Sequence, residues 1–299
     1  MTTTRVTLAT LAALKARGEK AVFLTAYDYP TATFFDRAGV DMLLVGDSAA
    51  MTMLGLPNTL GIALEEMLVF ARAVTRGAQR AFVIGDLPFL SYQPADETAV
   101  RSAGAFLVAG CDAVKCEGGV RIAPRVRAMT EAGIAVMGHL GLTPQALAQL
   151  GGYRVQGKTL AAAHRLVDDA LALEEAGAFS ILLEAMPAET AALVRDRVRI
   201  PIYGIGAGPH VDGQLVIAHD LLGSFVGDIA PRFVRRYAEV GRDIERAARE
   251  YAADVRGGRF PAPEHCYPIS AECEAEIRRA RGASAIPGLP DRPLTRALP

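Results

Sequence analysis

The chain has 299 residues, of which 51% are hydrophobic and 22% charged, and its net charge is -1. This composition is typical of a globular protein, and the near-neutral charge without a basic block excludes bulk attraction to nucleic acid or anionic lipid. No apolar run approaches the roughly 18 residues of a membrane helix, and residues 1–6 lack the apolar core of a signal sequence. We therefore expect a cytoplasmic protein with no nucleic-acid or membrane partner.

In chain order, the first predicted element is a helix over 8–16, opened by Thr7 and closed by Gly18. Short apolar runs then predict strands near 21–28, 42–47, 81–87, 113–117, 135–140, 179–185, 200–206 and 214–221. Helical patterns lie between them, at 64–75, 95–109, 121–132 and 159–176. About eight strand–helix repeats without a break in composition favour a parallel (β/α)8 barrel over an open sheet.

The last repeats are irregular. Too few residues separate the seventh and eighth strands for a crossover helix, and residues 231–255 are predicted to form one long amphipathic helix covering the barrel. We expect one catalytic domain over 1–267 and a partly flexible extension over 268–299. The extension contains a short charged helix over 270–280 and a tail punctuated by Pro287, Pro290, Pro293 and Pro299. This tail is expected to be mobile or to pack on another subunit.

Five of the predicted strands end on a carboxylate, namely Asp28, Asp47, Asp86, Glu117 and Glu184. The tips of parallel strands all lie on one side of a sheet, so five acids from distant segments would meet at one face. Carboxylates repel one another, and gathering them suggests a bound cation and a catalytic pocket.

Lys115 and Glu117 are two residues apart on a strand and share a face, whereas Cys116 points the opposite way. In a barrel this places the charged pair inward, either as functional groups or as a structural ion pair. Asp47 precedes Ser48 and Asp86 follows Gly85, so a ligand can approach the backbone closely at both carboxylates.

Magnesium prefers oxygen donors and keeps room for substrate and water, so two such aspartates would suit it. The alternative is that each aspartate caps a following helix. His139 is either a satisfied core histidine or a ligand contact at the barrel mouth. Gly204 to Gly208 resembles a phosphate-binding turn, but it lacks the P-loop and Rossmann spacings and more simply predicts a tight turn.

Several motifs together resemble those of the ketopantoate hydroxymethyltransferase family, in order and across residues 5 to 267. They are Leu24-Thr25-Ala26-Tyr27-Asp28, Val45-Gly46-Asp47-Ser48, Gly85-Asp86-Leu87-Pro88-Phe89, Lys115-Cys116-Glu117-Gly118-Gly119, Gly138-His139-Leu140-Gly141-Leu142-Thr143-Pro144-Gln145, Gly151-Gly152-Tyr153-Arg154-Val155-Gln156-Gly157, Gly204-Ile205-Gly206-Ala207-Gly208, Asp212-Gly213-Gln214 and Glu264-His265.

The resemblance implies a TIM barrel of the phosphoenolpyruvate mutase/isocitrate lyase-like type. It implies transfer of a hydroxymethyl group from 5,10-methylenetetrahydrofolate to 3-methyl-2-oxobutanoate in pantothenate biosynthesis, through a magnesium-stabilised enolate. Self-association, commonly as a homodecamer, is implied too. Glu184 would be the catalytic base. The implied metal ligands are Asp47, Asp86 and Glu117, the last directly or through water. The candidate substrate contacts are Asp47, Ser48, Asp86, Lys115 and His139.

The chain departs from the family pattern in one loop, residues 49–63. Ala49-Ala50-Met51 replaces the usual Leu-Gly-Met, and residues 55–63 lack the usual acidic and hydroxyl pair. The departure leaves two alternatives open: a divergent paralogue acting as a magnesium-dependent lyase or aldolase on another 2-oxoacid, and a non-catalytic scaffold on the same barrel. A requirement for folate would distinguish the first alternative from hydroxymethyl transfer.

Overall fold

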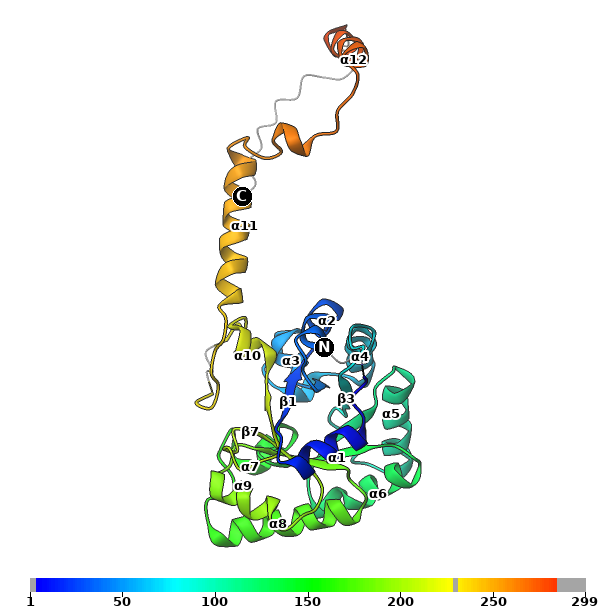
Figure 1. Cartoon of the computed structure of the whole chain (residues 1–299), viewed down its shortest axis with the longest axis vertical. Coiled ribbons are helices and arrows are strands. Elements are labelled where there is room, and N and C mark those ends of the chain that lie inside the picture. The colour runs from blue at the N-terminus through cyan, green and yellow to red at the C-terminus, as the bar shows by residue number, and fades with distance from the viewer. Residues whose placement is uncertain (1–3, 228–230, 284–299) are drawn as a thin grey trace. The chain divides into compact units, whose positions relative to one another are not determined.

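The computed structural model describes residues 4–227 and 231–283, and the chain divides into two compact units, 1–241 and 242–299 (Figure 1). The predicted domain boundary after residue 267 stays a prediction. The four prolines of the predicted tail lie outside the described residues. In the described ranges no helix is long and apolar enough to cross a membrane.

The first unit is a closed barrel of eight parallel strands paired in chain order. The strands are β1 Ala21–Thr25, β2 Met42–Val45, β3 Phe82–Asp86, β4 Ala113–Glu117, β5 Val136–Gly141, β6 Ser180–Glu184, β7 Ile202–Ile205 and β8 Gly213–Val216. Most strand residues are buried, because side chains of both faces are covered, and this explains the continuous apolar runs in the sequence. The predicted barrel and its eight strands are confirmed.

Helices surround the barrel wherever the connection is long enough (Figure 1). They are α1 Leu8–Arg17, α2 Tyr29–Arg37, α3 Ala49–Thr52, η1 Thr59–Gly61, α4 Leu64–Gly77, α5 Asp96–Val108, η2 Val120–Ile122, α6 Ala123–Glu131, η3 Pro144–Ala146, α7 Leu147–Leu150, α8 Leu160–Glu175, α9 Ala188–Arg195 and α10 Ala218–Leu222. Between β7 and β8 the chain forms a turn without a helix, as predicted, with Gly206 and Gly208 at positive φ.

Two apolar cores support the barrel. The larger one fills the layer between strands and helices, and the smaller one fills the barrel interior and is extended by α1, whose Leu11 is 1% exposed. The α1 caps are those predicted: the Thr7 hydroxyl accepts a hydrogen bond from Thr10 N–H, and Gly18 is left-handed with a φ of 69°.

The prediction of one helix over 231–255 is wrong at its start. Residues 231–239 are not helical, and α11 runs from Val240 to Arg256. Tertiary contacts explain the difference, because the Phe233 ring packs against Gly206 of the β7 turn and Tyr237 N–H donates to Leu221 C=O. The second unit continues with η4 Pro263–His265 and α12 Ala271–Ala283, which agrees with the short helix predicted there.

Candidate active site

Strand register brings the predicted site residues together at the carboxyl ends of the strands. Asp86 at the end of β3 pairs with Lys115 on β4, and Glu117 on β4 pairs with His139 on β5. Glu184 ends β6 beside Gly141 of β5. Because alternate residues of a strand share a face, all these charged side chains enter the barrel mouth. Active sites of (β/α)8 enzymes lie at this end of the barrel.

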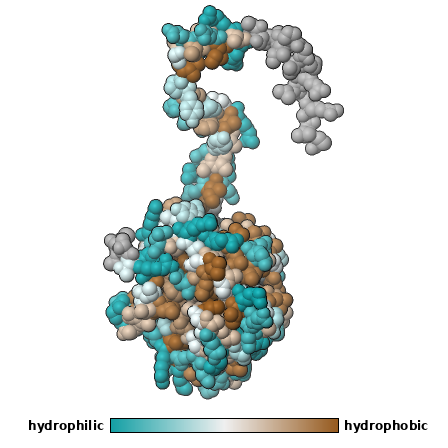
Figure 2. All heavy atoms as spheres, turned by 90° about the vertical axis from the view of Figure 1, so that its right-hand side faces the viewer, coloured by the Kyte–Doolittle hydropathy of each residue, from teal (hydrophilic) through white to brown (hydrophobic). Residues whose placement is uncertain are grey.

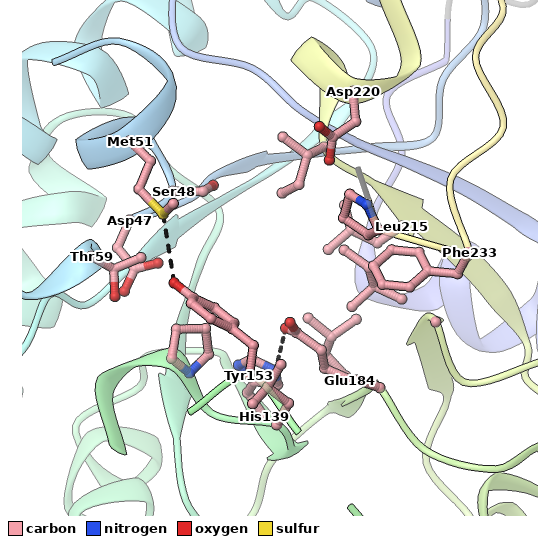
Figure 3. A pocket seen from close by; sticks show the side chains of 18 of the residues that line it. Asp47, Ser48, Met51, Thr59, His139, Tyr153, Glu184, Leu215, Asp220 and Phe233 are labelled. Carbon is pink, nitrogen blue, oxygen red and sulfur yellow. Dashed lines mark hydrogen bonds and ion pairs between the residues drawn. The ribbon is translucent and has the colours of Figure 1, made fainter. Parts of the chain in front are cut away.

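Four of the five predicted strand-tip acids line one cavity of about 690 Å³ in the barrel unit. In Figure 3, Asp47 and Ser48 lie on one side of this cavity, Asp220 and Phe233 lie on the other, and Glu184 projects between them. The cavity wall is otherwise mostly apolar. It is lined further by side chains including Leu44, Leu142, Val155, Leu182, Ile205, Leu215, Ile217 and Phe225. The site is therefore a charged cluster at one end of a largely apolar cavity.

The fifth acid, Asp28, does not line the cavity. Its carboxylate caps α2 by accepting hydrogen bonds from Thr31 N–H and the Thr31 hydroxyl, both at 2.8 Å. The prediction that all five acids converge is wrong at this position, because the chain turns directly into a helix after Asp28. Asp47 and Asp86 cap no helix among the described residues. The Asp47 carboxylate accepts from Gln145, and the Asp86 carboxylate pairs with Lys115 and accepts from the Asp47 backbone N–H.

Lys115 is the buried cation of the cluster. Its Nζ lies 2.8 Å from Asp86 Oδ1 and 3.9 Å from Glu117 Oε1, and its side chain is 3% exposed. Burial opposes the charged ammonium, but Asp86, Glu117 and Asp47 outweigh burial and raise the pKa of Lys115. Cys116 faces the outer core layer, as predicted from the strand alternation.

The carboxylates carry more negative charge than Lys115 can offset. Burial, followed by the charges of Asp86 and Glu117, raises the pKa of Asp47 well above its usual value. Burial also raises the pKa of Asp86 despite the nearby Lys115. Asp86 Oδ1 has the Lys115 ammonium as its neighbour, and Glu117 Oε1 lies near both Lys115 Nζ and His139 Nδ1. A dense set of buried carboxylates beside a single lysine favours binding of a further cation.

His139 joins two of the carboxylates. Its Nδ1 lies 3.3 Å from Glu117 Oε1, and its Nε2 lies 3.1 Å from Glu184 Oε2 (Figure 3). Burial and the charge of Lys115 oppose protonation of the imidazole, but Glu117 and Glu184 outweigh them and raise the pKa of His139 to about 9. Glu117 shows the complementary change: burial would raise its pKa, but the bond with His139 lowers it. His139 therefore lies between the two carboxylates, and its protonated form would attract both.

Ser48 and the loop that departs from the family pattern form part of the cavity wall. The Ser48 hydroxyl lies 2.8 Å from the hydroxyl of buried Tyr27. From the loop, Met51, Thr52 and Thr59 line the cavity, and the Tyr153 hydroxyl approaches Met51 Sδ at 3.7 Å. Residues of this loop therefore border the site, and the loop replaces none of the charged groups of the cluster.

Gln145 belongs to one of the motifs that resemble the family, but the motif alone predicts no role for it. It lies in η3, 8% exposed, where its side chain contacts Asp47 and its backbone N–H donates to Glu117. The sequence signal for a role was a glutamine in the loop that follows β5. Its partners at the ends of β2 and β4 are too distant in sequence to be inferred from that signal. Among the described residues, no group of three or more His, Cys, Asp or Glu side chains is arranged as a ready metal site.

The fold and the cluster define a class: a (β/α)8 barrel with acids gathered at the carboxyl ends of its strands, a fold that also occurs in the phosphoenolpyruvate mutase/isocitrate lyase superfamily. A phosphonopyruvate hydrolase, solved with oxalate and Mg2+, superposes with a TM-score of 0.58 at 17% identity, covering 94% of this chain and 98% of that one. A 2,3-dimethylmalate lyase of that superfamily gives a TM-score of 0.53 at 17% identity, covering 93% and 98%. At this identity the likeness concerns the fold alone.

Sequence comparison identifies the family within that class. The family model for ketopantoate hydroxymethyltransferase matches residues 5–263. A 3-methyl-2-oxobutanoate hydroxymethyltransferase of Syntrophobacter fumaroxidans is 52% identical over 91% of this chain and 96% of its own length. One from Chloroflexus aurantiacus is 50% identical over 93% and 98%. The chain belongs to the ketopantoate hydroxymethyltransferase family, which confirms the resemblance inferred from the motifs.

Proposed function

We propose that this enzyme transfers a hydroxymethyl group from 5,10-methylenetetrahydrofolate to 3-methyl-2-oxobutanoate and forms 2-dehydropantoate for pantothenate synthesis. The observation that carries the proposal is a cluster at the barrel mouth in a chain about half identical to named hydroxymethyltransferases; it joins the partly buried Glu184 to the buried residues Asp47, Asp86, Lys115, Glu117 and His139. The acceptor is a small 2-oxoacid, and the apolar part of the cavity leaves room for a larger donor.

The residues fit a magnesium ion. Their carboxylates offer hard oxygen donors. Asp47, Asp86 and Glu117 are all buried at the barrel mouth, and burial and their mutual repulsion raise the pKa of Asp47, which a bound cation would relieve. We assign Asp47 and Asp86 as protein ligands, with Glu117 beside them, directly or through water. When bound, the ion supplies Lewis-acid polarisation of the keto oxygen of the substrate.

The protein groups divide the remaining work. Glu184 is the proposed base that removes the C3 proton of the oxoacid, because it lines the cavity and its side chain, 17% exposed, is accessible from it. His139 orients Glu184 through Nε2, so we reassign it from direct substrate contact to positioning of the base. Lys115 and Ser48 would bind the oxygens of the oxoacid, and the positive charge of Lys115 stabilises negative charge that develops there.

The lyase or aldolase alternative is not favoured. The relatives at about 50% identity are named hydroxymethyltransferases, whereas the lyase among the solved structures shares 17% identity and so only the fold. A scaffold without catalysis would not require the acid cluster, which is complete in this chain.

We also propose self-association, with a homodecamer as the expected assembly, and action in the cytoplasm. Apolar side chains on the packed pair α2 and α4 support an interface between subunits, because Tyr29, Phe34 and Val69 are each more than half exposed. Figure 2 shows apolar residues beside hydrophilic ones on one face of the barrel unit.

The test follows deuterium uptake at C3 of 3-methyl-2-oxobutanoate by NMR, with magnesium and without folate. We expect metal-dependent exchange by the wild type and loss of exchange in Glu184→Gln, because an amide cannot accept the proton. Glu189→Gln, an exposed change in the following helix α9, is the matched control and should exchange like the wild type.

A second arm adds 5,10-methylenetetrahydrofolate and measures 2-dehydropantoate. Product formation that requires folate would support the donor assignment. If the folded, metal-loaded wild type catalyses no exchange, the assigned acceptor is wrong. If exchange occurs but folate yields no product, the donor is wrong and a folate-independent reaction takes its place.

A further inference from the structure

Gln145 makes an unusually complete set of contacts for a residue outside the charged cluster. Its Nε2 donates to Asp47 Oδ2 and to Leu87 C=O, both at 2.9 Å. Its backbone N–H donates to Glu117 Oε2 at 2.9 Å. One residue of η3 thus contacts two carboxylates that come from the ends of β2 and β4.

The orientation of the Gln145 amide is determined by its neighbours. Leu87 C=O can only accept a hydrogen bond, so the amide atom that faces it must be the donor Nε2. Oε1 then lies on the other side, where the Tyr92 hydroxyl and Gln93 Nε2 each approach it at 2.9 Å. A flipped amide would set its NH2 against the donor Gln93 Nε2 and its oxygen against the acceptors Leu87 C=O and Asp47 Oδ2, which costs hydrogen bonds in a buried site.

Tyr92 extends the same network to the backbone of β4. Its hydroxyl, fully buried, accepts from Glu117 N–H at 2.9 Å and lies 3.0 Å from Glu117 C=O. At the tip of β4, Tyr92 therefore holds the backbone of Glu117, and the backbone N–H of Gln145 holds the Glu117 carboxylate. Both contacts fix Glu117 relative to Asp47.

We propose that Gln145 is a positioning residue that sets the spacing and orientation of Asp47 and Glu117 for cation binding. It does not line the cavity, and it acts through these two carboxylates. The proposal rests on the magnesium assignment made above and deepens it. Partners that orient ligating carboxylates typically change metal affinity by about 10–100-fold when they are removed.

The test measures Mn2+ affinity of the metal-free protein by calorimetry or electron paramagnetic resonance, with no oxoacid or folate. Gln145→Met keeps the side-chain volume but removes the NH2 and C=O of the amide, so the contact with Asp47 is lost while the backbone N–H to Glu117 stays. We expect it to weaken Mn2+ binding by about 10–100-fold. Gln93→Ala is the control, because it removes one partner of Oε1 and leaves Tyr92 and both carboxylate contacts intact. It should remain within about threefold of the wild type.

Kinetics separate positioning from a purely structural role. At limiting Mg2+ the Gln145→Met enzyme should show a raised oxoacid KM and slow C3 exchange, and excess Mg2+ should restore much of kcat. A purely structural residue would lower the melting temperature but leave the Mn2+ affinity of the folded protein unchanged. That result, or an equal loss in Gln93→Ala, overturns the proposal.

If Gln145→Met does not fold, Tyr92→Phe tests the same network. It removes the hydroxyl between Glu117 and Gln145 and should weaken Mn2+ binding by about 3–10-fold; unchanged affinity overturns the proposal. Weaker Mn2+ binding in a protein that catalyses no C3 exchange would support the Gln145 role and reject the proposed reaction. A wild type that binds no Mn2+ would overturn both.

Discussion

Replacing Lys115 by methionine tests the electrostatics of the site. Lys115 Nζ lies 2.8 Å from Asp86 Oδ1 and 3.9 Å from Glu117 Oε1. At an effective dielectric constant of about 20, these distances correspond to about 6 and 4 kcal/mol of attraction. Removing the ammonium also removes its desolvation cost of several kcal/mol. Because the carboxylates stay behind without their cation, we expect a net loss of about 3–5 kcal/mol in the free energy of unfolding.

The loss should depend on pH and on magnesium. Burial already raises the pKa of Asp47 and Asp86, and removal of Lys115 should raise both further. An acid whose pKa is raised in the folded state destabilises the fold above its unfolded pKa, so the penalty should shrink as pH falls from 7 towards 4. Mg2+ should stabilise the variant, because it offsets the same carboxylates.

Urea unfolding at pH 7 and at about pH 5, with and without Mg2+, measures these effects. Lys158→Met, which removes an exposed lysine from the loop before α8, is the control and should change stability by less than about 0.5 kcal/mol. A Lys115→Met protein within about 1 kcal/mol of the wild type, or a loss independent of pH, would refute the argument that Lys115 offsets the buried acids.

Three further changes test other parts of the structure. Gly85→Ala should cost about 1–3 kcal/mol in urea unfolding, because a Cβ added to this β3 residue would lie 2.2 Å from Cδ1 of Phe106 in α5. The control is Gly104→Ala, also in α5, where an added Cβ meets nothing within 4 Å and should not destabilise the protein. Asp212→Asn should cost about 2–4 kcal/mol at pH 7, because Asp212 accepts from Ile202 N–H and pairs with Arg195 and Lys15. Those contacts outweigh burial and lower the pKa of Asp212. The contribution of Asp212 to the free energy of unfolding is therefore present above its unfolded pKa and should be lost as pH falls through its folded pKa. A stability difference between wild type and Asp212→Asn that is as large at about pH 2 as at pH 7 would contradict this. Ser48→Ala should raise the oxoacid KM by about 3–10-fold in steady-state kinetics and leave Mn2+ affinity unchanged; a normal KM would remove Ser48 from the substrate site.

The barrel could be predicted because its strands are covered on both faces, so burial requires apolar residues at successive positions. The site could be predicted for a related reason. Parallel strands end on one face, and the side-chain alternation assigns Lys115 and Glu117 inward and Cys116 outward. These are local signals, and they depend on the sequence of each strand alone.

Other features depend on contacts that no local pattern contains. Asp28 follows an apolar run just as Asp47 does, but the chain turns at once into α2 and its carboxylate caps that helix. Residues 231–239 have a helical pattern, but packing of Phe233 on Gly206 prevails. The role of Gln145 requires partners from three other segments, so only the folded structure shows it.

The division of the cavity suggests where members of this family can vary. The charged groups lie at the ends of strands. The register of β3 to β6 determines the spacing of Asp86, Lys115, Glu117, His139 and Glu184. Much of the rest of the wall comes from loops, including Met51 and Thr59 of the divergent segment and Phe233 after α10. A loop can change length or sequence without shifting the register. Changes at residues 49–63 should therefore alter how substrates fit, measured as KM, and leave the Glu184-dependent removal of the C3 proton largely intact.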